Sequence, residues 1–216
     1  RAILQALVAM HETPVDDLKT FTAAKMLERY TTMFLRRLGD TRDAVMVKCQ
    51  RLGAMLAERI PDQTLPPVTL HGDMHMGNVL FNSAAAGGVG VTLIDLDEAV
   101  RGDPEYDLAI LASSLVLMAA LQPDSARAAL ATACAIPALY ELEGGHAVAA
   151  ERFRWYFAGA IASRQIKRCI SHCAPHCDQL TEQLANAALA VMQASVPEPD
   201  AIAHAMALQA MELQDA

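Results

Sequence analysis

His71-Gly72-Asp73-Met74-His75-Met76-Gly77-Asn78 is the part of this sequence with the most polar groups of catalytic type between apolar runs. It places a carboxylate and an amide between two short apolar runs, 68–70 and 79–81, that are typical of β-strands. A third apolar run, 89–94, follows a glycine-containing connection and leads into Asp95. This connection favours a β-hairpin, which would bring Asp95 back beside Asn78.

The next segment, Gly102-Asp103-Pro104-Glu105-Tyr106-Asp107, leads into an apolar run that ends at Leu121. Asp103 is a suitable N-cap and Pro104 suits the first helical position, so we expect a helix to begin here. The run from Leu108 to Leu121 is shorter than the roughly 20 residues that cross a bilayer. We therefore expect a buried helix of a soluble protein, with no membrane partner.

Most of the remaining chain has the spacing of helices. The first is expected to stop near Thr13-Pro14, and a second to begin there, with Thr13 as N-cap, and to reach about Arg37. Pro61 should end a third helix, whose buried face consists of Val45, Cys49, Leu52, Leu56 and Ile60. Later helices are predicted at 124–135, 146–170, 178–193 and 200–214, with breaks at Pro137, Gly144-Gly145, Pro175 and Pro197-Glu198-Pro199. The predicted fold class is α+β, mainly α-helical.

Composition and charge narrow the functional classes. The chain has 216 residues and is 53% hydrophobic, which is typical of a globular protein. A formal charge of -8 and a pI near 5.3 argue against a nucleic-acid partner. The five cysteines and the absence of a signal peptide favour a reduced, cytoplasmic setting. The first residue is Arg1 and a helical pattern begins at once, so a piece of a longer chain is expected.

The polar groups of the loop suit work on a nucleotide triphosphate. One carboxylate can orient an attacking hydroxyl and accept its proton. An amide oxygen and a second carboxylate can hold Mg²⁺ against the phosphates, because Mg²⁺ prefers hard oxygen ligands and keeps several waters. Asp73, Asn78 and Asp95 have the types and spacing for these three tasks.

Three motifs in this order resemble the aminoglycoside phosphotransferase family, a branch of the protein-kinase-like fold that includes choline and other small-molecule kinases. They are His71-Gly72-Asp73-x4-Asn78, Ile94-Asp95-x-Asp97 and Gly102-Asp103-Pro104-x2-Asp107-Leu108-Ala109. The resemblance implies transfer of the γ-phosphoryl group of ATP, with Mg²⁺, to a hydroxyl of a small molecule. The acceptor would be an aminoglycoside-like antibiotic, a sugar or an amino alcohol, and antibiotic resistance is one role that this suggests.

The resemblance also implies a role for each matching residue. Asp73 would be the catalytic base, and Asn78 and Asp95 would bind Mg²⁺ and through it the nucleotide. His71 and Asp107 would support the catalytic loop, with Asp107 reaching back from its helix to the loop's backbone amides. Asp97 would have a supporting acidic role near the metal.

The resemblance divides this single domain into three parts. Residues 1–67 look like the helices that follow the interlobe hinge, 68–109 like the catalytic and metal-binding core, and 110–216 like a helical subdomain on the substrate side. The family's N-lobe supplies a phosphate-covering loop and a lysine, whereas the lysines here, Lys19, Lys25, Lys48 and Lys167, all lie in helical patterns. The chain is thus expected to be a C-lobe that requires an N-lobe from the same or another chain. By itself it should bind Mg·ATP weakly and turn over little substrate.

Other readings of the same residues stay open. In a metal-dependent hydrolase, His71, Asp73, His75 and Asp95 would hold metal ions, together with Asp97, and activate water. A non-catalytic kinase-like half-module is the third class. Cys169, Cys173 and Cys177 could bind a metal, although cysteines four apart also pack well on a helix. A solvated face is the expected setting of the basic residues Arg152, Arg154, Arg164, Lys167 and Arg168.

Overall fold

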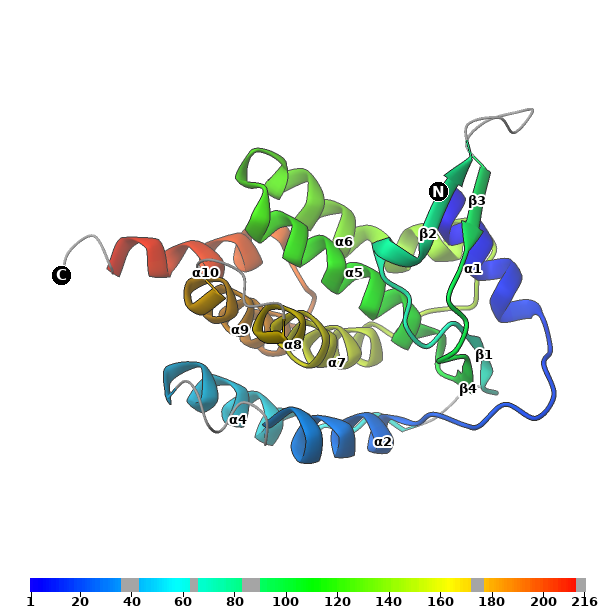
Figure 1. The fold of residues 1–216 in the computed structure, drawn as a ribbon, viewed down its shortest axis with the longest axis horizontal. Coiled ribbons are helices and arrows are strands. Elements are labelled where there is room, and N and C mark those ends of the chain that lie inside the picture. Colours follow the sequence, from blue (N-terminus) through cyan, green and yellow to red (C-terminus); the bar gives the residue numbers. More distant parts are fainter. Residues whose placement is uncertain (36–42, 63–65, 83–89, 172–176, 213–216) are drawn as a thin grey trace.

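The computed structural model describes residues 1–35, 43–62, 66–82, 90–171 and 177–212. Helices make up most of this part of the chain, and the four short strands gather with α1 (Ala2–Glu12) at one end of the molecule (Figure 1). The α+β, mainly α-helical class is therefore confirmed. The remaining helical segments are α2 (Ala23–Glu28), η1 (Arg29–Phe34), α4 (Asp43–Glu58), η2 (Met76–Asn78), α5 (Pro104–Leu121), η3 (Pro123–Ser125), α6 (Ala126–Leu142), α7 (Ala150–Ala160), η4 (Ile161–Ile166), α8 (Lys167–Ser171), α9 (Cys177–Gln193) and α10 (Pro199–Glu212).

The core is built around α5. Thirteen of its residues are buried, from Pro104 to Ala119. By length and composition alone α5 is apolar enough to cross a membrane, but 72% of it is buried inside the protein, so it packs as a core helix. Helices α6, α7 and α9 and the π-helical segment η4 pack against it. The first turn of α5 carries Asp107, which places one end of this rigid core at the polar loop.

Two antiparallel pairs of strands hold the polar loop at both ends. β2 (Val79–Asn82) pairs with β3 (Gly90–Leu93) in the register Val79↔Leu93, so the predicted hairpin is confirmed. β1 (Val68–Leu70) pairs with β4 (Val100–Gly102). Sequence reasoning missed β4, because three residues around an exposed arginine show too little alternation to predict a strand.

The predicted second helix is wrong over its first half. Thr13 is the C-cap of α1, and its hydroxyl donates to the carbonyl of Ala9 at 2.7 Å. The helix begins at Ala23, after Thr22, whose side chain accepts a hydrogen bond from the Lys25 amide. Just before this helix the chain runs alongside β4: Thr20 forms a β-bridge with Arg101, and the Phe21 amide donates to the carbonyl of Arg101. A tertiary strand contact therefore overrides the helix-start signal of Pro14.

Three smaller predictions also need correction. Ile60 is 44% exposed and lies beyond α4, although the other four residues of the predicted buried face are buried. Pro137 lies inside α6, since Ala133, Ile136 and Tyr140 bury that helix against its neighbours and packing outweighs the lost hydrogen bond. The helix predicted from residue 146 begins at 150 and continues through η4 into α8.

Candidate active site

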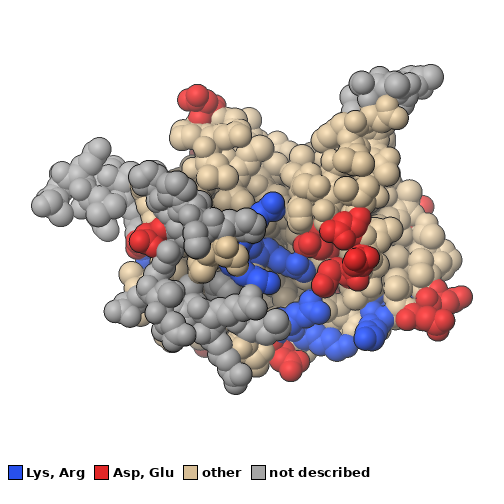
Figure 2. All heavy atoms as spheres, in the orientation of Figure 1, with Lys and Arg blue, Asp and Glu red and all other residues tan. Residues whose placement is uncertain are grey.

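The polar loop carries an ion pair between an acidic and a basic side chain, Asp73 and Arg164. Figure 2 shows Lys and Arg side chains gathered at the centre of one face, next to a group of carboxylates. The contacts of the loop residues show how the fold produces this arrangement.

Asp107 fixes the start of the loop. Its carboxylate is fully buried and accepts hydrogen bonds from the backbone amides of His71, at 2.7 Å, and Gly72, at 3.0 Å. Hydrogen bonds to an ionised carboxylate are among the stronger ones in proteins. These are the contacts that the resemblance implied for Asp107.

His11 supports this anchor from α1, and sequence reasoning missed it. Its Nε2 lies 3.2 Å from Asp107 Oδ2, so the ring donates there, and its Nδ1 lies 2.8 Å from the hydroxyl of Tyr140. Burial raises the pKa of Tyr140 to about 12, so that hydroxyl keeps its proton at neutral pH. The burial of His11 could have been predicted, because this residue continues the helical spacing of the buried Leu4 and Leu7.

His71 links the loop to the end of β3. The side chain is fully buried, and Nε2 lies 2.9 Å from the carbonyl oxygen of Ile94. A carbonyl can only accept, so Nε2 carries the proton in this bond. His71 thus holds the loop against the segment that leads into Asp95, in keeping with the supporting role expected for it.

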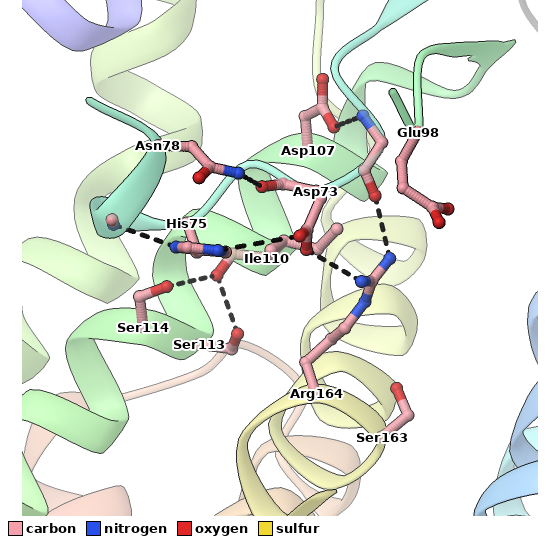
Figure 3. Close-up of polar contacts among 12 residues, drawn as sticks. Asp73, His75, Asn78, Glu98, Asp107, Ile110, Ser113, Ser114, Ser163 and Arg164 are labelled. Atoms are coloured by element: carbon pink, nitrogen blue, oxygen red, sulfur yellow. Dashed lines mark hydrogen bonds and ion pairs between the residues drawn. The ribbon is translucent and has the colours of Figure 1, made fainter. Parts of the chain in front are cut away.

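Asp73 is paired with Arg164, which reaches toward the loop from η4 (Figure 3). Arg164 Nη1 lies 2.8 Å from Asp73 Oδ1, and Nη2 donates to the Gly72 carbonyl and the Tyr106 hydroxyl. Burial alone would lower the pKa of Arg164, but Tyr106, Asp73 and Glu98 outweigh it and the pKa is raised. The expectation of a solvated face is wrong for Arg164, because its side chain pairs with Asp73. The two residues lie 91 positions apart, so the spacing of nearby residues could not predict their contact.

His75 faces the second oxygen of Asp73. Its Nδ1 accepts a hydrogen bond from the Gly77 amide, and its Nε2 lies 3.7 Å from Asp73 Oδ2. Burial lowers the pKa of His75, and the nearby Arg168 and Arg164 lower it further, although Asp73 acts in the opposite direction. The imidazole is therefore neutral at neutral pH, and its Nε2–H points toward the carboxylate.

Asn78 is buried, and its Nδ2 donates to the backbone carbonyl of Asp73 at 3.0 Å. The amide oxygen points away from that bond (Figure 3). Across the hairpin, the Ile94 amide donates to the Asn78 carbonyl at 3.0 Å, so the exposed Asp95 follows directly after a residue that is paired with Asn78. An amide oxygen and a carboxylate on adjoining backbone segments fit the hard-oxygen preference of Mg²⁺.

Asp95 has a φ of 63°, a left-handed conformation that non-glycine residues adopt rarely and that aspartate tolerates better than most. Residues in such sparsely populated regions cluster at functional sites. Asp97 is exposed two residues later, and no hydrogen bond among the described residues joins it to the loop.

The hydrolase alternative is not supported by this geometry. No group of three or more His, Cys, Asp or Glu residues in the described ranges is arranged to hold a metal ion. His71, moreover, uses its Nε2 for a backbone carbonyl. The predicted cysteine site includes Cys173, which lies outside the described residues.

A cavity of about 260 Å³ opens beside Asp73. It is bounded by the loop, by α5 and by the η4–α8 helix, and its lining consists of Asp73, His75, Ile110, Arg164, Gln165, Lys167, Arg168 and Ser171. A larger cavity of about 470 Å³ lies between the end of α1 and β1 and contains none of the predicted catalytic or metal-binding residues. A small molecule thus has space next to Asp73.

A helical body with a catalytic-type loop held between short strands is the arrangement of a protein-kinase-like phosphotransferase. The chain belongs to the phosphotransferase enzyme family APH, whose family model matches residues 1–144. A search of curated proteins finds no match.

Solved structures share the fold. A choline/ethanolamine kinase family protein from Mesorhizobium loti aligns with a TM-score of 0.57 at 18% identity, over 96% of this chain and 66% of that one. The aminoglycoside phosphotransferase APH(3'')-Id from Streptomyces rimosus aligns with a TM-score of 0.50 at 20% identity, over 72% of this chain and 58% of that one. At these identities the likeness concerns the fold alone. This chain spans about two thirds of the length of the first structure.

Proposed function

We propose that this chain is the helical lobe of an ATP-dependent kinase that transfers the γ-phosphoryl group to a hydroxyl of a small molecule. The observation that carries the proposal is the position of Asp73. Its loop is held by Asp107 and Asn78, one side of it faces a cavity, and the hairpin brings Asp95 close to the loop. Family membership makes a phosphotransferase the expected class.

Each residue has a defined part in this proposal. Asp73 accepts the proton of the acceptor hydroxyl and orients it for in-line attack. Asn78 and Asp95 hold Mg²⁺, which neutralises phosphate charge when bound. His71 and Asp107 keep the loop in place, and catalysis then arises mainly from positioning.

We further propose that a nucleotide-covering lobe, from the same protein or another chain, completes the enzyme. Among the described residues the strands are β1 to β4 alone, and they form no β-rich lobe. Leu80 and Phe81 on β2 are 53% and 58% exposed, an apolar surface that a second lobe would cover. This chain alone is then expected to release little ADP.

The direct test is Mg·ATP-dependent ADP release by the longest natural form of the protein, with a panel of aminoglycosides, sugars, amino alcohols and hydroxy acids. Asp73→Asn is expected to lower kcat by about 10² to 10⁴ for the best acceptor, since it removes the base and keeps the shape. Asp124→Asn, a change at an exposed aspartate far from the loop in sequence, is the matched control. Acceptor-dependent release that survives Asp73→Asn would contradict the assignment of the base.

A further inference from the structure

Arg164 reaches from η4 to the polar loop and joins three groups there (Figure 3). Its Nη1 donates to Asp73 Oδ1 at 2.8 Å, and its Nη2 donates to the Gly72 carbonyl at 2.9 Å and to the Tyr106 hydroxyl at 2.8 Å. A guanidinium group is planar and presents its donors in a fixed geometry. Contacts to a carboxylate and to the backbone carbonyl just before it therefore fix both the position and the rotation of the Asp73 side chain.

Tyr106 gives Arg164 a rigid point of attachment. Its ring is buried and packs against Phe21, with ring centroids 4.6 Å apart, and against Tyr156 at 5.6 Å. Burial raises the pKa of Tyr106, although Arg164 opposes the shift, so the hydroxyl stays protonated at neutral pH while its oxygen accepts from Arg164. Since Tyr106 lies in the first turn of α5, Arg164 connects the loop to the core helix.

The two oxygens of the Asp73 carboxylate have different surroundings. Oδ1 accepts from Arg164 at 2.8 Å. Oδ2 lies 3.7 Å from His75 Nε2, beyond hydrogen-bonding distance, and within the described part of the chain it accepts no hydrogen bond. The side chain of Asp73 is 26% exposed and lines the cavity of about 260 Å³. Oδ2 is therefore the oxygen that a molecule in this cavity can use.

Two further features set Arg164 apart from a surface arginine. Although burial works against its charge, the pKa of Arg164 is raised, chiefly by Tyr106 and Asp73. Arg164 also lies in a π-helical segment, and such segments are rare and occur frequently at functional sites. The side chain is thus charged and held at a defined place in the loop.

We infer that Arg164 is a positioning residue, which holds Oδ1 of Asp73 so that Oδ2 faces the acceptor hydroxyl. This inference rests on the proposed kinase function and adds to it a residue that lies outside all three sequence motifs. Without Arg164 the base is still present, but its side chain can rotate away from the acceptor. The rate of transfer then falls, because it depends on the alignment of the reacting groups.

The transfer needs no reactant beyond those of the kinase. The acceptor hydroxyl donates its proton to Asp73 Oδ2, and its oxygen forms a bond to the γ-phosphorus. The bond from that phosphorus to the β–γ bridging oxygen breaks, and ADP leaves with the electron pair. The proton then passes from Asp73 to solvent, while Arg164 keeps its own protons throughout.

The first test is steady-state ADP release by the longest natural form of the protein, with the acceptor that it uses best. Arg164→Gln should lower kcat by about 10²-fold, because misplacing a catalytic group by about 1 Å has an effect of that size. The KM of the acceptor should change by less than about threefold, since the lost contacts act on the base and not on the bound acceptor. Arg127→Gln, at an exposed arginine on α6, should leave both constants unchanged. A raised KM with an unchanged kcat, or a higher kcat, would overturn the inference.

A double-variant cycle separates action through Asp73 from a general structural effect. In the Asp73→Asn background, Arg164→Gln should lower kcat further by less than about threefold, because the base that it positions is already absent. If Arg164 only supported the fold, its loss would reduce kcat by the same factor in both backgrounds. An additional loss of that full size in the double variant would overturn the inference.

A measurement without ATP separates failure of the inference from failure of the kinase proposal. In the 216-residue chain, NMR of the arginine guanidinium groups should show hindered rotation for Arg164, as expected of a group fixed by three hydrogen bonds. Asp73→Ala should change these signals, and Asp124→Ala, at an exposed aspartate, should not. Signals that are the same in Asp73→Ala and the original chain would overturn the inference. If the signals change as expected but no acceptor stimulates ADP release, the kinase proposal is wrong and the hold of Arg164 on Asp73 stands.

Discussion

One buried carboxylate decides whether the loop has a fixed position. Asp107 accepts two backbone hydrogen bonds from adjacent loop residues, and His11 contacts the same group. Because the side chain is fully buried, water cannot replace a lost partner. The geometry of Asp73 therefore depends on a residue that has no chemical part in the reaction.

Asp107→Asn should destabilise the folded protein. The amide can accept from one of the two backbone N–H groups, while its NH₂ group faces the other donor. We expect the free energy of unfolding to fall by about 3 kcal/mol, in line with breaking a buried charged hydrogen-bond group. Urea unfolding measures the effect, and Asp124→Asn at an exposed site should stay within about 0.5 kcal/mol of the original protein. Equal stability of the two variants would remove Asp107 from its anchoring role.

The loop and its neighbouring turn act as one element. Gly72 has a φ of 81°, and a Cβ there would collide with the backbone carbonyl of Glu98. The loop that carries Asp73 is thus pressed against the turn that follows Asp95. Close backbone approach of this kind requires glycine.

Gly72→Ala and Gly144→Ala form a matched pair at the element scale. Both glycines have positive φ, at 81° and 94°, but a Cβ at Gly144 meets nothing within 4 Å. Gly144→Ala should lower the free energy of unfolding by about 1 kcal/mol, because alanine is strained at a positive φ. Gly72→Ala should cost clearly more and lower ADP release as well, since the loop must shift. Thermal unfolding and the kinase assay test this, and indistinguishable effects would show that the two segments are not in contact.

At the scale of the whole molecule, a buried ionic cluster joins distant segments. Arg152 on α7 lies 3.6 Å from Glu105 and 3.8 Å from Asp103, at the start of α5. Arg152 also donates to the backbone carbonyl of Asp62, after α4, and Tyr156 donates to Asp103. The expected solvated face is therefore wrong for Arg152 too. Asp103 stands at the predicted N-cap, but its side chain makes no cap hydrogen bond.

Burial raises the pKa of Glu105 above the ordinary value of 4.5, although hydrogen bonds and Arg152 oppose the shift. The native state therefore holds this proton more tightly than the unfolded chain. Its stabilising contribution is complete below about pH 4.5 and is lost as the pH rises through the raised pKa.

Glu105→Gln should remove that dependence. The stability of the original protein relative to this variant is expected to decline as the pH rises from about 4.5. Urea unfolding of both proteins between pH 4 and pH 8 checks the sign. Glu151→Gln, at an exposed position on α7, should run parallel to the original protein. If the original protein instead became more stable relative to the Glu105→Gln variant as the pH rises, the raised pKa of Glu105 would be contradicted.

Patterns among neighbouring residues were sufficient to predict some helices and strands and the candidate site residues. Glycine, apolar alternation and Pro104 predicted the β2–β3 hairpin and the start of α5. Local signals failed where partners are distant. Pro14 does not start a helix, because the chain around Phe21 runs alongside β4 and hydrogen-bonds to it.

The fold class, the family and the candidate residues Asp73, Asn78, Asp95 and Asp107 could be predicted from short motifs, because those motifs involve only near neighbours along the chain. Other features are visible only in the folded protein: Arg164 pairs with Asp73, His11 contacts Asp107, and Lys167 and Arg168 line a cavity beside the loop. These contacts join residues that lie about 90 or more positions apart. They form because α5 packs against α6, α7 and η4, a result of burial across the whole core that no local periodicity specifies.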